Sequence, residues 1–235
     1  MNAHLTRLSG DHRYYVAAAA GIITVVLAGF SIDMPLLSHP RSVSALVRLH
    51  GVVMLAWIAV FFTQALPVAR DRVRLHMRLG IFGVVLALIV VVADTSTLIV
   101  ACRLGGHHMP PGMPRSPFPA FGLFNLLTFA ILVGTALTVR RRLTDWHKRL
   151  MLLAAILLLD AALARFIGAY TSWSIDASTL RNLLMFACIA IGTWRHRRLH
   201  PAFVVGGALA FANDYVASWA AGTAARAKSA AAVVS

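Results

Sequence analysis

The sequence predicts an all-α membrane protein, a polytopic bundle of about seven transmembrane helices. Of its 235 residues, 59% are hydrophobic and only 13% are charged, whereas soluble domains carry roughly 25% charged residues. The apolar residues arrive in blocks long enough to cross a hydrocarbon core of about 30 Å as helices, which takes roughly 20 residues each. The blocks are continuous rather than alternating, and this favours helices over a β-barrel.

Seven blocks define the predicted spans. They are Val16–Leu37, Ser44–Pro67, Leu79–Cys102, Phe118–Val139, Leu150–Tyr170, Trp173–Trp194 and Pro201–Ala221. The sixth has the shortest continuous apolar run, Leu183–Trp194, which predicts a short, tilted or re-entrant helix. No small-residue cleavage site follows the first span, so we interpret it as an uncleaved anchor. Residues 1–15 then form a short N-terminal segment, residues 16–221 the membrane domain, and the Ala-rich residues 222–235 a disordered tail.

The distribution of positive charge predicts the orientation. The net charge is +14, but Lys and Arg concentrate in alternate connections, which carry 14 of these residues against seven on the other side. By the positive-inside rule, the N-terminus is cytoplasmic and the C-terminus external. The basic loops are expected to rest on anionic headgroups. We therefore expect a protein of the bacterial cytoplasmic (inner) membrane whose partner is the lipid bilayer, not nucleic acid.

A short motif, His-x-Arg-Leu, occurs three times, each time just before an outward-running span. The copies are His76–Leu79, His147–Leu150 and His196–Leu199. Each following span carries one aspartate, respectively Asp94, Asp160 and Asp214. The pattern predicts three related hairpins with the first span added, and repeats of this kind often place binding sites where they meet. The alternative is chance recurrence of a short basic motif.

The residues around these motifs resemble a known group of proteins. His50-Gly51, Trp57, Gln64 and the stretch Leu75–Gly80 are similar to a group of uncharacterised bacterial multi-pass membrane proteins of the domain-of-unknown-function kind. Asp145–Met151 and Arg198–Pro201 fit the same group. The resemblance spans roughly residues 45 to 215. It implies a membrane helical fold, and it implies no activity, substrate or cofactor.

Ionisable and amide side chains within the spans mark the candidate site. Such residues are costly in a membrane and by default indicate a ligand or ion pathway. In the predicted orientation they gather in the outer half of the bundle, and they are His50, Asp94, Asn125, Asp160, Arg165 and Asp214. Asp160 and Arg165 lie too far apart around one helix to pair. Arg165 is therefore expected to meet Asp94, Asp176 or an anionic ligand.

Two of these aspartates are expected to act together. Asp94 shares a helical face with Gly83 and Ala87, and Asp214 shares one with Gly207 and Ala210. Small residues mark close helix contacts in lipid, so both carboxylates are predicted to point into the bundle at similar depth. The competing interpretation is that the polar residues only hold helices together.

Metal and haem sites are further alternatives. His50 with Asp94, Asp160 and Asp214 forms a nitrogen and oxygen ligand set suited to a divalent metal. The loop that contains His107, His108 and several methionines offers soft ligands. A b-type haem needs two axial ligands, commonly histidines at matching depth on different helices. His76, His147 and His196 are the candidates for that role.

The sequence therefore supports three functions of different classes. The first is an outward-facing ionisable pocket that binds or transports a small polar molecule or ion, with an Asp and His set as proton relay. The second is a membrane oxidoreductase with b-haem near the cytoplasmic side. The third is a non-catalytic subunit of a membrane complex. Oligomeric state and ligand identity do not follow from these patterns.

The topology is testable with reporter fusions. A reporter fused at Arg141 should be cytoplasmic and one fused at Gly222 external, because the positive-inside rule places the more basic connections in the cytoplasm. Activity assays specific for each compartment would measure the two locations. The same side for both positions would contradict a chain of seven spans.

Overall fold

The computed structural model describes residues 2–31, 45–70, 72–103, 118–170 and 175–234. Within these ranges the chain forms eight α-helices. They are α1 (Asn2–Ser31), α3 (Ala45–Ala69), α4 (Val73–Arg103), α5 (Phe118–Val139), α6 (Thr144–Leu157), α7 (Asp160–Tyr170), α8 (Ala177–His196) and α9 (Pro201–Val234). Helix α9 runs past Gly222, where the sequence predicts the start of a disordered tail.

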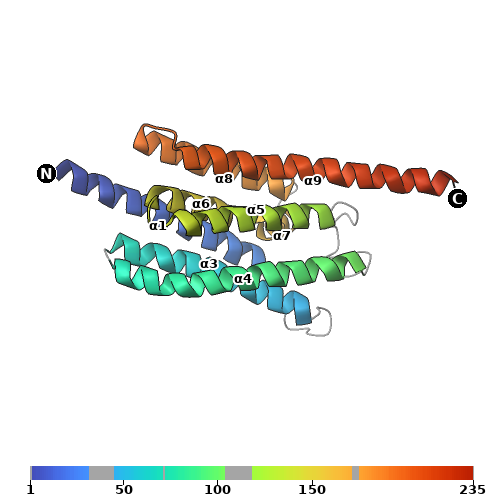
Figure 1. Ribbon diagram of the computed structural model, residues 1–235, viewed down its shortest axis with the longest axis horizontal. Helices are drawn as coiled ribbons and strands as arrows, with labels where there is room; N and C mark the ends of the chain where they lie inside the picture. Colours follow the sequence, from blue (N-terminus) through green and yellow to red (C-terminus); the bar gives the residue numbers. More distant parts are fainter. Residues whose placement is uncertain (1, 32–44, 71, 104–117, 171–174, 235) are drawn as a thin grey trace.

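The helices lie side by side along one axis, and α1 begins at one end of the bundle while α9 ends at the other (Figure 1). Two antiparallel pairs, α3 with α4 and α5 with α6, make the most extensive contacts. Helix α1 packs on α3 and α7, and α9 packs on α5 and α6. Helix α5 also contacts α4. Helix α5 thereby connects the α3–α4 pair to α6 and α9.

Several helices are long and apolar enough to cross a membrane. Four meet this description singly, over His12–Ser31, Ala45–Val68, Val73–Arg103 and Ala120–Val139. Helices α6 and α7 meet it together as a pair bent by 42°, which makes five. Helices α8 and α9 are not among them. Each carries a pair of adjacent polar residues, Arg181-Asn182 near the start of α8 and Asn213-Asp214 within α9, and these lower its hydropathy. The all-α prediction is confirmed, and the count of seven spans is not.

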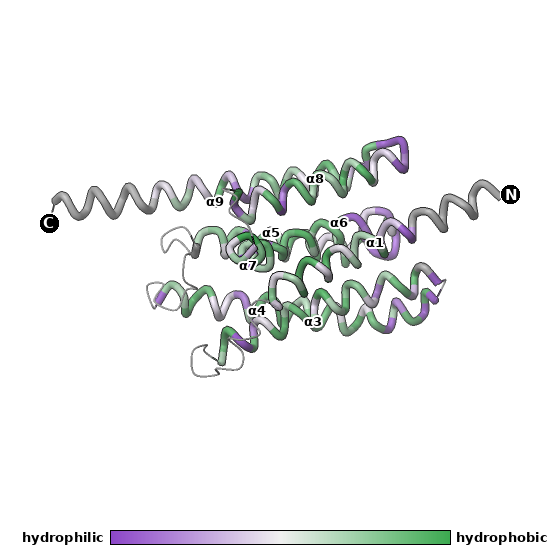
Figure 2. The backbone as a smooth tube through the Cα atoms, turned by 180° about the vertical axis from the view of Figure 1, so that it is seen from behind, coloured by the Kyte–Doolittle hydropathy of each residue, from purple (hydrophilic) through white to green (hydrophobic). Residues whose placement is uncertain are grey.

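The buried core is apolar and centres on α6. Residues Leu152–Leu157 are all at most 1% exposed. The outer surface is apolar as well, because large side chains such as Ile81 and Phe82 on α4 are more than two thirds exposed. Figure 2 shows hydrophobic residues along the helices and hydrophilic ones at the α3–α4 and α8–α9 connections, at one end of the bundle. A bundle that is apolar inside and outside is typical of proteins surrounded by lipid.

The small-residue faces predicted from the sequence are buried. On α4 the buried residues are Gly83, Ala87, Val90 and Ala93. On α9, Gly206, Gly207 and Ala210 are buried. On α3, Trp57 also faces inward, since it is 2% exposed and meets the Phe129 ring edge-on at 5.3 Å between centroids. These faces set the rotation of α4 and α9 about their axes and so aim the polar residues nearby.

The repeated motif has one structural role in two of its three copies. His76 is the fourth residue of α4 and His147 the fourth of α6. Each ring places Nδ1 next to a carbonyl of the preceding helix, that of Gln64 at 3.2 Å and that of Ala136 at 3.0 Å. A carbonyl can only accept, so Nδ1–H donates in both. His196 instead ends α8. The α3–α4 and α5–α6 hairpins are therefore related, and the third copy is not equivalent.

Helices α1 and α7 cross so closely at Gly29 that a substitution there tests their packing. A Cβ on Gly29 would lie 2.3 Å from the Ala162 carbonyl oxygen, whereas one on Gly21, also in α1, would meet nothing within 4 Å. We expect Gly29→Ala to lower the free energy of unfolding by about 1–3 kcal/mol through overpacking. Gly21→Ala is the matched control and should be neutral or slightly stabilising. Thermal unfolding in detergent measures both, and equal stability of the two variants would contradict this crossing.

Candidate functional site

The most concentrated polar cluster in the described chain surrounds Arg181 of α8. Its guanidinium is 0% exposed and contacts two carboxylates. Nη1 donates to Oδ2 of Asp160 on α7 at 2.5 Å, and Nη2 donates to Oδ2 of Asp214 on α9. One buried cation therefore joins three helices. A buried charge is tolerated only when it is paired and hydrogen-bonded, and Arg181 satisfies both conditions.

Amide side chains complete the cluster. Asn182 donates to Asp214 at 2.6 Å and accepts from Arg181. Asn125 of α5 donates to Asp160 at 3.0 Å and accepts from Asn213 at 2.6 Å. The Thr128 hydroxyl donates to Asn213 at 3.3 Å. The network thus links α5, α7, α8 and α9. We call these residues the Arg181 network: Asn125, Thr128, Asp160, Arg181, Asn182, Asn213 and Asp214.

A break in the fifth predicted span positions Asp160. Helix α6 ends at Leu157 and α7 begins at Asp160, with a bend of 42° between them. Asp160 is therefore in the first turn of α7, where the helix dipole favours a negative charge. The backbone N–H of Leu159 donates to the Ile156 carbonyl at 3.0 Å, a tightened turn at the break. Without the break, Asp160 would be in the middle of a continuous span.

One acceptor of the Arg181 network has no partner. Oδ1 of Asp160 is buried and makes no hydrogen bond to the described residues, although the side chain as a whole remains 29% exposed. Two aspartates and one arginine also leave one surplus negative charge when both aspartates are ionised. An unpaired buried acceptor and an uncompensated charge are each costly in a low dielectric. Both costs would be relieved by a proton, a cation or a hydrogen-bond donor at Oδ1.

His50 and Asp94 form a second, smaller cluster. Nδ1 of His50 on α3 lies 3.2 Å from Oδ1 of Asp94 on α4, within ion-pair range but not aligned as a hydrogen bond. The two side chains are 27% and 22% exposed. Helix α4, which carries Asp94, packs mainly on α3 and α5, whereas α9, which carries Asp214, packs mainly on α5 and α6. The structure thus pairs Asp214 with Asp160 through Arg181, and it pairs Asp94 with His50.

The other predicted site residues lie apart or outside the described chain. Arg165 donates to the Ala161 carbonyl at 2.8 Å and lies over the Phe30 ring at 4.6 Å. Asp176, which the sequence offered as a partner for Arg165, caps α8. His107 and His108 fall outside the described residues. Among the residues that are described, no three His, Cys, Asp or Glu side chains are grouped to hold a metal ion. His50 and Asp94 pair with each other, and Arg181 separates Asp160 from Asp214.

Sequence reasoning missed Arg181, Asn182 and Thr128. Arg181 lies inside the sixth predicted span but before its continuous apolar run, which starts at Leu183, so it is not among the predicted site residues. The helix signal that includes it is the cap at Asp176. The Asp176 carboxylate accepts from the Thr179 N–H at 2.9 Å and from the Thr179 hydroxyl at 2.7 Å. An Asp three residues before Thr at a helix start is a recognisable N-cap, and it extends α8 over Arg181.

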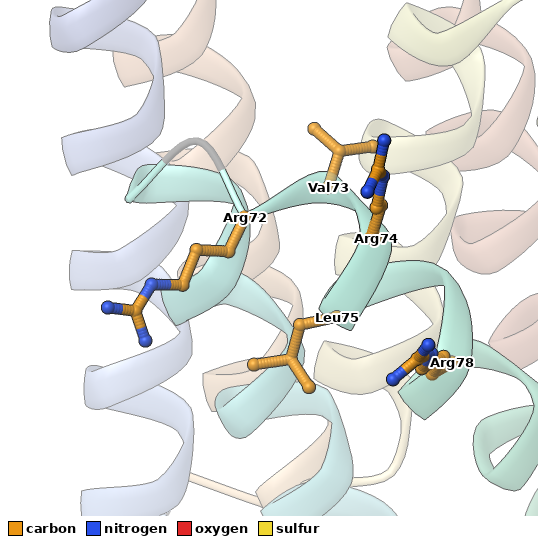
Figure 3. Close-up of a pocket in the computed structure, with 5 residues that line it drawn as sticks. All are labelled: Arg72, Val73, Arg74, Leu75 and Arg78. Atoms are coloured by element: carbon orange, nitrogen blue, oxygen red, sulfur yellow. The ribbon is translucent and has the colours of Figure 1, made fainter.

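The end of the bundle that holds the α3–α4 and α8–α9 connections is strongly basic. The first turns of α4 line an open hollow with Arg72, Val73, Arg74, Leu75 and Arg78 (Figure 3). Figure 3 shows the three arginine side chains spread around these turns with Leu75 among them. Such a surface, basic and apolar together, suits the level of lipid headgroups.

Comparison with protein-family models, with curated proteins and with solved structures finds no match to this chain. The resemblance to uncharacterised membrane proteins therefore stays a prediction.

The buried ion pairs give a prediction on stability. Arg181→Met should lower the free energy of unfolding by about 3–5 kcal/mol, because it leaves two carboxylates without their shared cation. Arg195→Met is the control on the same helix, at an exposed position, and should change stability by less than about 1 kcal/mol. Thermal unfolding in detergent would measure both. A small and equal effect of the two substitutions would show that Arg181 is not buried between the aspartates.

The α8 cap gives a prediction on pH. Hydrogen bonds from the Ser178 hydroxyl and the Thr179 N–H hold the pKa of Asp176 at about 2, below its ordinary 3.8. A depressed carboxyl pKa stabilises the fold fully above the unfolded pKa, and this contribution is lost as pH falls through about 2. We expect Asp176→Ala to cost about 0.5–2 kcal/mol near neutral pH. Asp176→Asn, which still caps but cannot ionise, should retain most stability. A cost of Asp176→Ala that does not shrink in acid would contradict the assignment.

Proposed function

We propose that this chain is a seven-span protein of the cytoplasmic membrane that binds and transports a small polar molecule or ion, with proton coupling at the Arg181 network. The observation that carries the proposal is Arg181, fully buried and shared by Asp160 and Asp214. Intramembrane ionisable residues of this kind mark ion and substrate pathways and proton relays. The charge balance favours a ligand that is a cation or carries a positive group.

The surplus charge gives the coupling a physical basis. Two carboxylates that compete for one guanidinium in a low dielectric cannot both stay ionised cheaply. Either a proton or a cation can neutralise the surplus negative charge, so binding of one favours release of the other. We expect the proton or the cation to bind at Oδ1 of Asp160, because this oxygen has no hydrogen-bond partner among the described residues. The side chains of Asp160 and Asp214 are 29% and 17% exposed, so the network is not completely closed to a small ligand.

The backbone around Asp160 supports the same function. Many transporters build their sites from discontinuous helices near the middle of the membrane, where helix ends face the ligand. The bent pair of α6 and α7 has this form, and Asp160 starts its second half. A network that served only to hold helices together would not need a break there or an unpaired acceptor.

The seven-span count rests on the pairing inside the network. Helices α8 and α9 carry Arg181, Asn182, Asn213 and Asp214, which would be prohibitive in lipid if unpaired. Because these residues bond to one another and to Asp160, both helices can cross the membrane. An odd number of crossings also agrees with the start of α1 and the end of α9 at opposite ends of the bundle (Figure 1). The basic end with Arg72, Arg74 and Arg78 would then face the cytoplasm (Figure 3).

A stability screen tests the binding step. Purified protein would be melted between pH 5 and 8 with Na⁺, K⁺, Mg²⁺, Ca²⁺ or putrescine added singly. We expect one of these cations to raise the melting temperature, and more so at higher pH, because it competes with a proton. Asp160→Asn should abolish this response. Asp145→Asn, at the exposed start of α6, should leave it unchanged.

Uptake into proteoliposomes would then test transport of the cation that binds. A response to pH and cations that is identical in wild type and Asp160→Asn would refute the proposed site. Binding without uptake, with wild type and Asp160→Asn equally inactive across a pH gradient, would refute transport and leave a binding protein.

A further inference from the structure

The histidine pair at the basic end of the bundle is not used by the proposed function. His76 of α4 and His147 of α6 come from two copies of the repeated motif, 71 residues apart in sequence. Their rings lie with centroids 6.4 Å apart and planes inclined by 74°. The two helices have their main contacts elsewhere, α4 on α3 and α5, and α6 on α5 and α9. The rings therefore approach each other across the bundle from separate hairpins.

Both rings are held in the tautomer that leaves Nε2 unprotonated. Nδ1–H of His76 donates to the Gln64 carbonyl and Nδ1–H of His147 donates to the Ala136 carbonyl. Nε2 is then the unprotonated nitrogen of each neutral ring, with its lone pair free to coordinate. Metal-binding histidines characteristically donate their other N–H to a backbone carbonyl, which orients the ring and strengthens the ligand. The same arrangement occurs twice here, on two neighbouring rings.

The ring separation suits two ligands on opposite sides of one metal. An imidazole nitrogen lies about 2.0–2.1 Å from a bound metal, so two rings placed across it have centroids about 6 Å apart. The measured 6.4 Å is close to this value. An edge-to-face pair of rings without a metal also has its centroids about 4.5–7 Å apart, so the distance alone does not identify a metal site. The case for a metal site therefore also depends on the tautomers of the two rings and on the charged residues around them.

The surroundings select the kind of metal centre. The connections beside the two histidines are rich in arginine, with Arg72, Arg74 and Arg78 on one side and Arg140–Arg142 on the other. Asp145, near His147, is already paired with Lys148 at 2.6 Å. A bare divalent cation would be repelled by this field. A porphyrin with carboxylate side chains would be attracted to it, because arginine binds carboxylates in a bidentate manner.

We propose that His76 and His147 are the two axial ligands of a b-type haem at the basic end of the bundle. Each histidine would supply Nε2 to the iron, and arginines of the neighbouring connections would pair with the haem carboxylates. This site is separate from the Arg181 network and does not depend on it. It also gives a reason for the repeat, since one His-x-Arg-Leu motif provides a ligand from each hairpin. The third copy, at His196, ends a helix and takes no part.

Spectroscopy of the full-length protein tests the site, with hemin as the probe. We expect protein titrated with hemin to saturate at about one haem per chain, with the Soret and α-bands of a six-coordinate, low-spin iron. His76→Asn and His147→Asn are the informative variants. The asparagine amide can still donate to the backbone carbonyl that Nδ1–H contacts, so the hairpin is kept while the ligand nitrogen is lost. Each variant should lose the low-spin spectrum and bind hemin at least tenfold more weakly.

The matched control is His200→Asn. His200 lies at the same end, 5.9 Å from the Trp146 ring between centroids, but its Nδ1 accepts from the Ala202 N–H at 3.1 Å. Its ring therefore has the opposite tautomer, and this variant should bind hemin like wild type. Hemin binding that is equal in wild type and in both histidine variants would reflect partition into detergent and would overturn the proposal. Zinc or copper bound through His76 and His147 in place of haem would overturn it too.

Discussion

The buried guanidinium of Arg181 is the constraint on which the second half of the structure depends. A charge that is fully removed from solvent must be paired, and its partners come from α7 and α9. This fixes the rotation of α7, α8 and α9 relative to one another. The amides of Asn125 and Asn213 then extend the same network to α5. Apolar packing alone would leave these rotations poorly determined, because aliphatic faces in lipid are nearly interchangeable.

The α3–α4 and α5–α6 hairpins are each organised by a different interaction. In the α3–α4 and α5–α6 hairpins a histidine in the first turn of the second helix donates to a carbonyl of the helix before it. A short connection and this one hydrogen bond set the register of each hairpin. Small residues then let the helices approach, as at Gly83 beside the Gln64 side chain. The same histidine can serve as a structural donor through Nδ1 and as a ligand through Nε2.

The two proposed sites lie in different parts of the molecule and use opposite electrostatics. The Arg181 network has one surplus negative charge and an unpaired acceptor, Asp160 Oδ1, so it suits a proton or a cation. The His76–His147 pair is surrounded by arginines, so it suits an anionic cofactor. The His50–Asp94 pair, partly exposed on α3 and α4, is a third polar group that has no role in either proposal. This separation allows each site to be tested without disturbing the other.

The sequence by itself determined the all-α class, the approximate helix positions and the buried small-residue faces, because hydropathy and helical periodicity are local properties. It also identified Asn125, Asp160 and Asp214 as polar residues within apolar helices. Only the tertiary structure decided which of them meet. Arg181 is not among the predicted site residues because the continuous apolar run of its span begins two residues later. Asp94 is matched to Asp214 by helix face and depth, and neither property identifies the partner of a side chain. Depth along a helix can be counted from sequence, whereas the partner across the bundle depends on helix order and rotation, which no local pattern records.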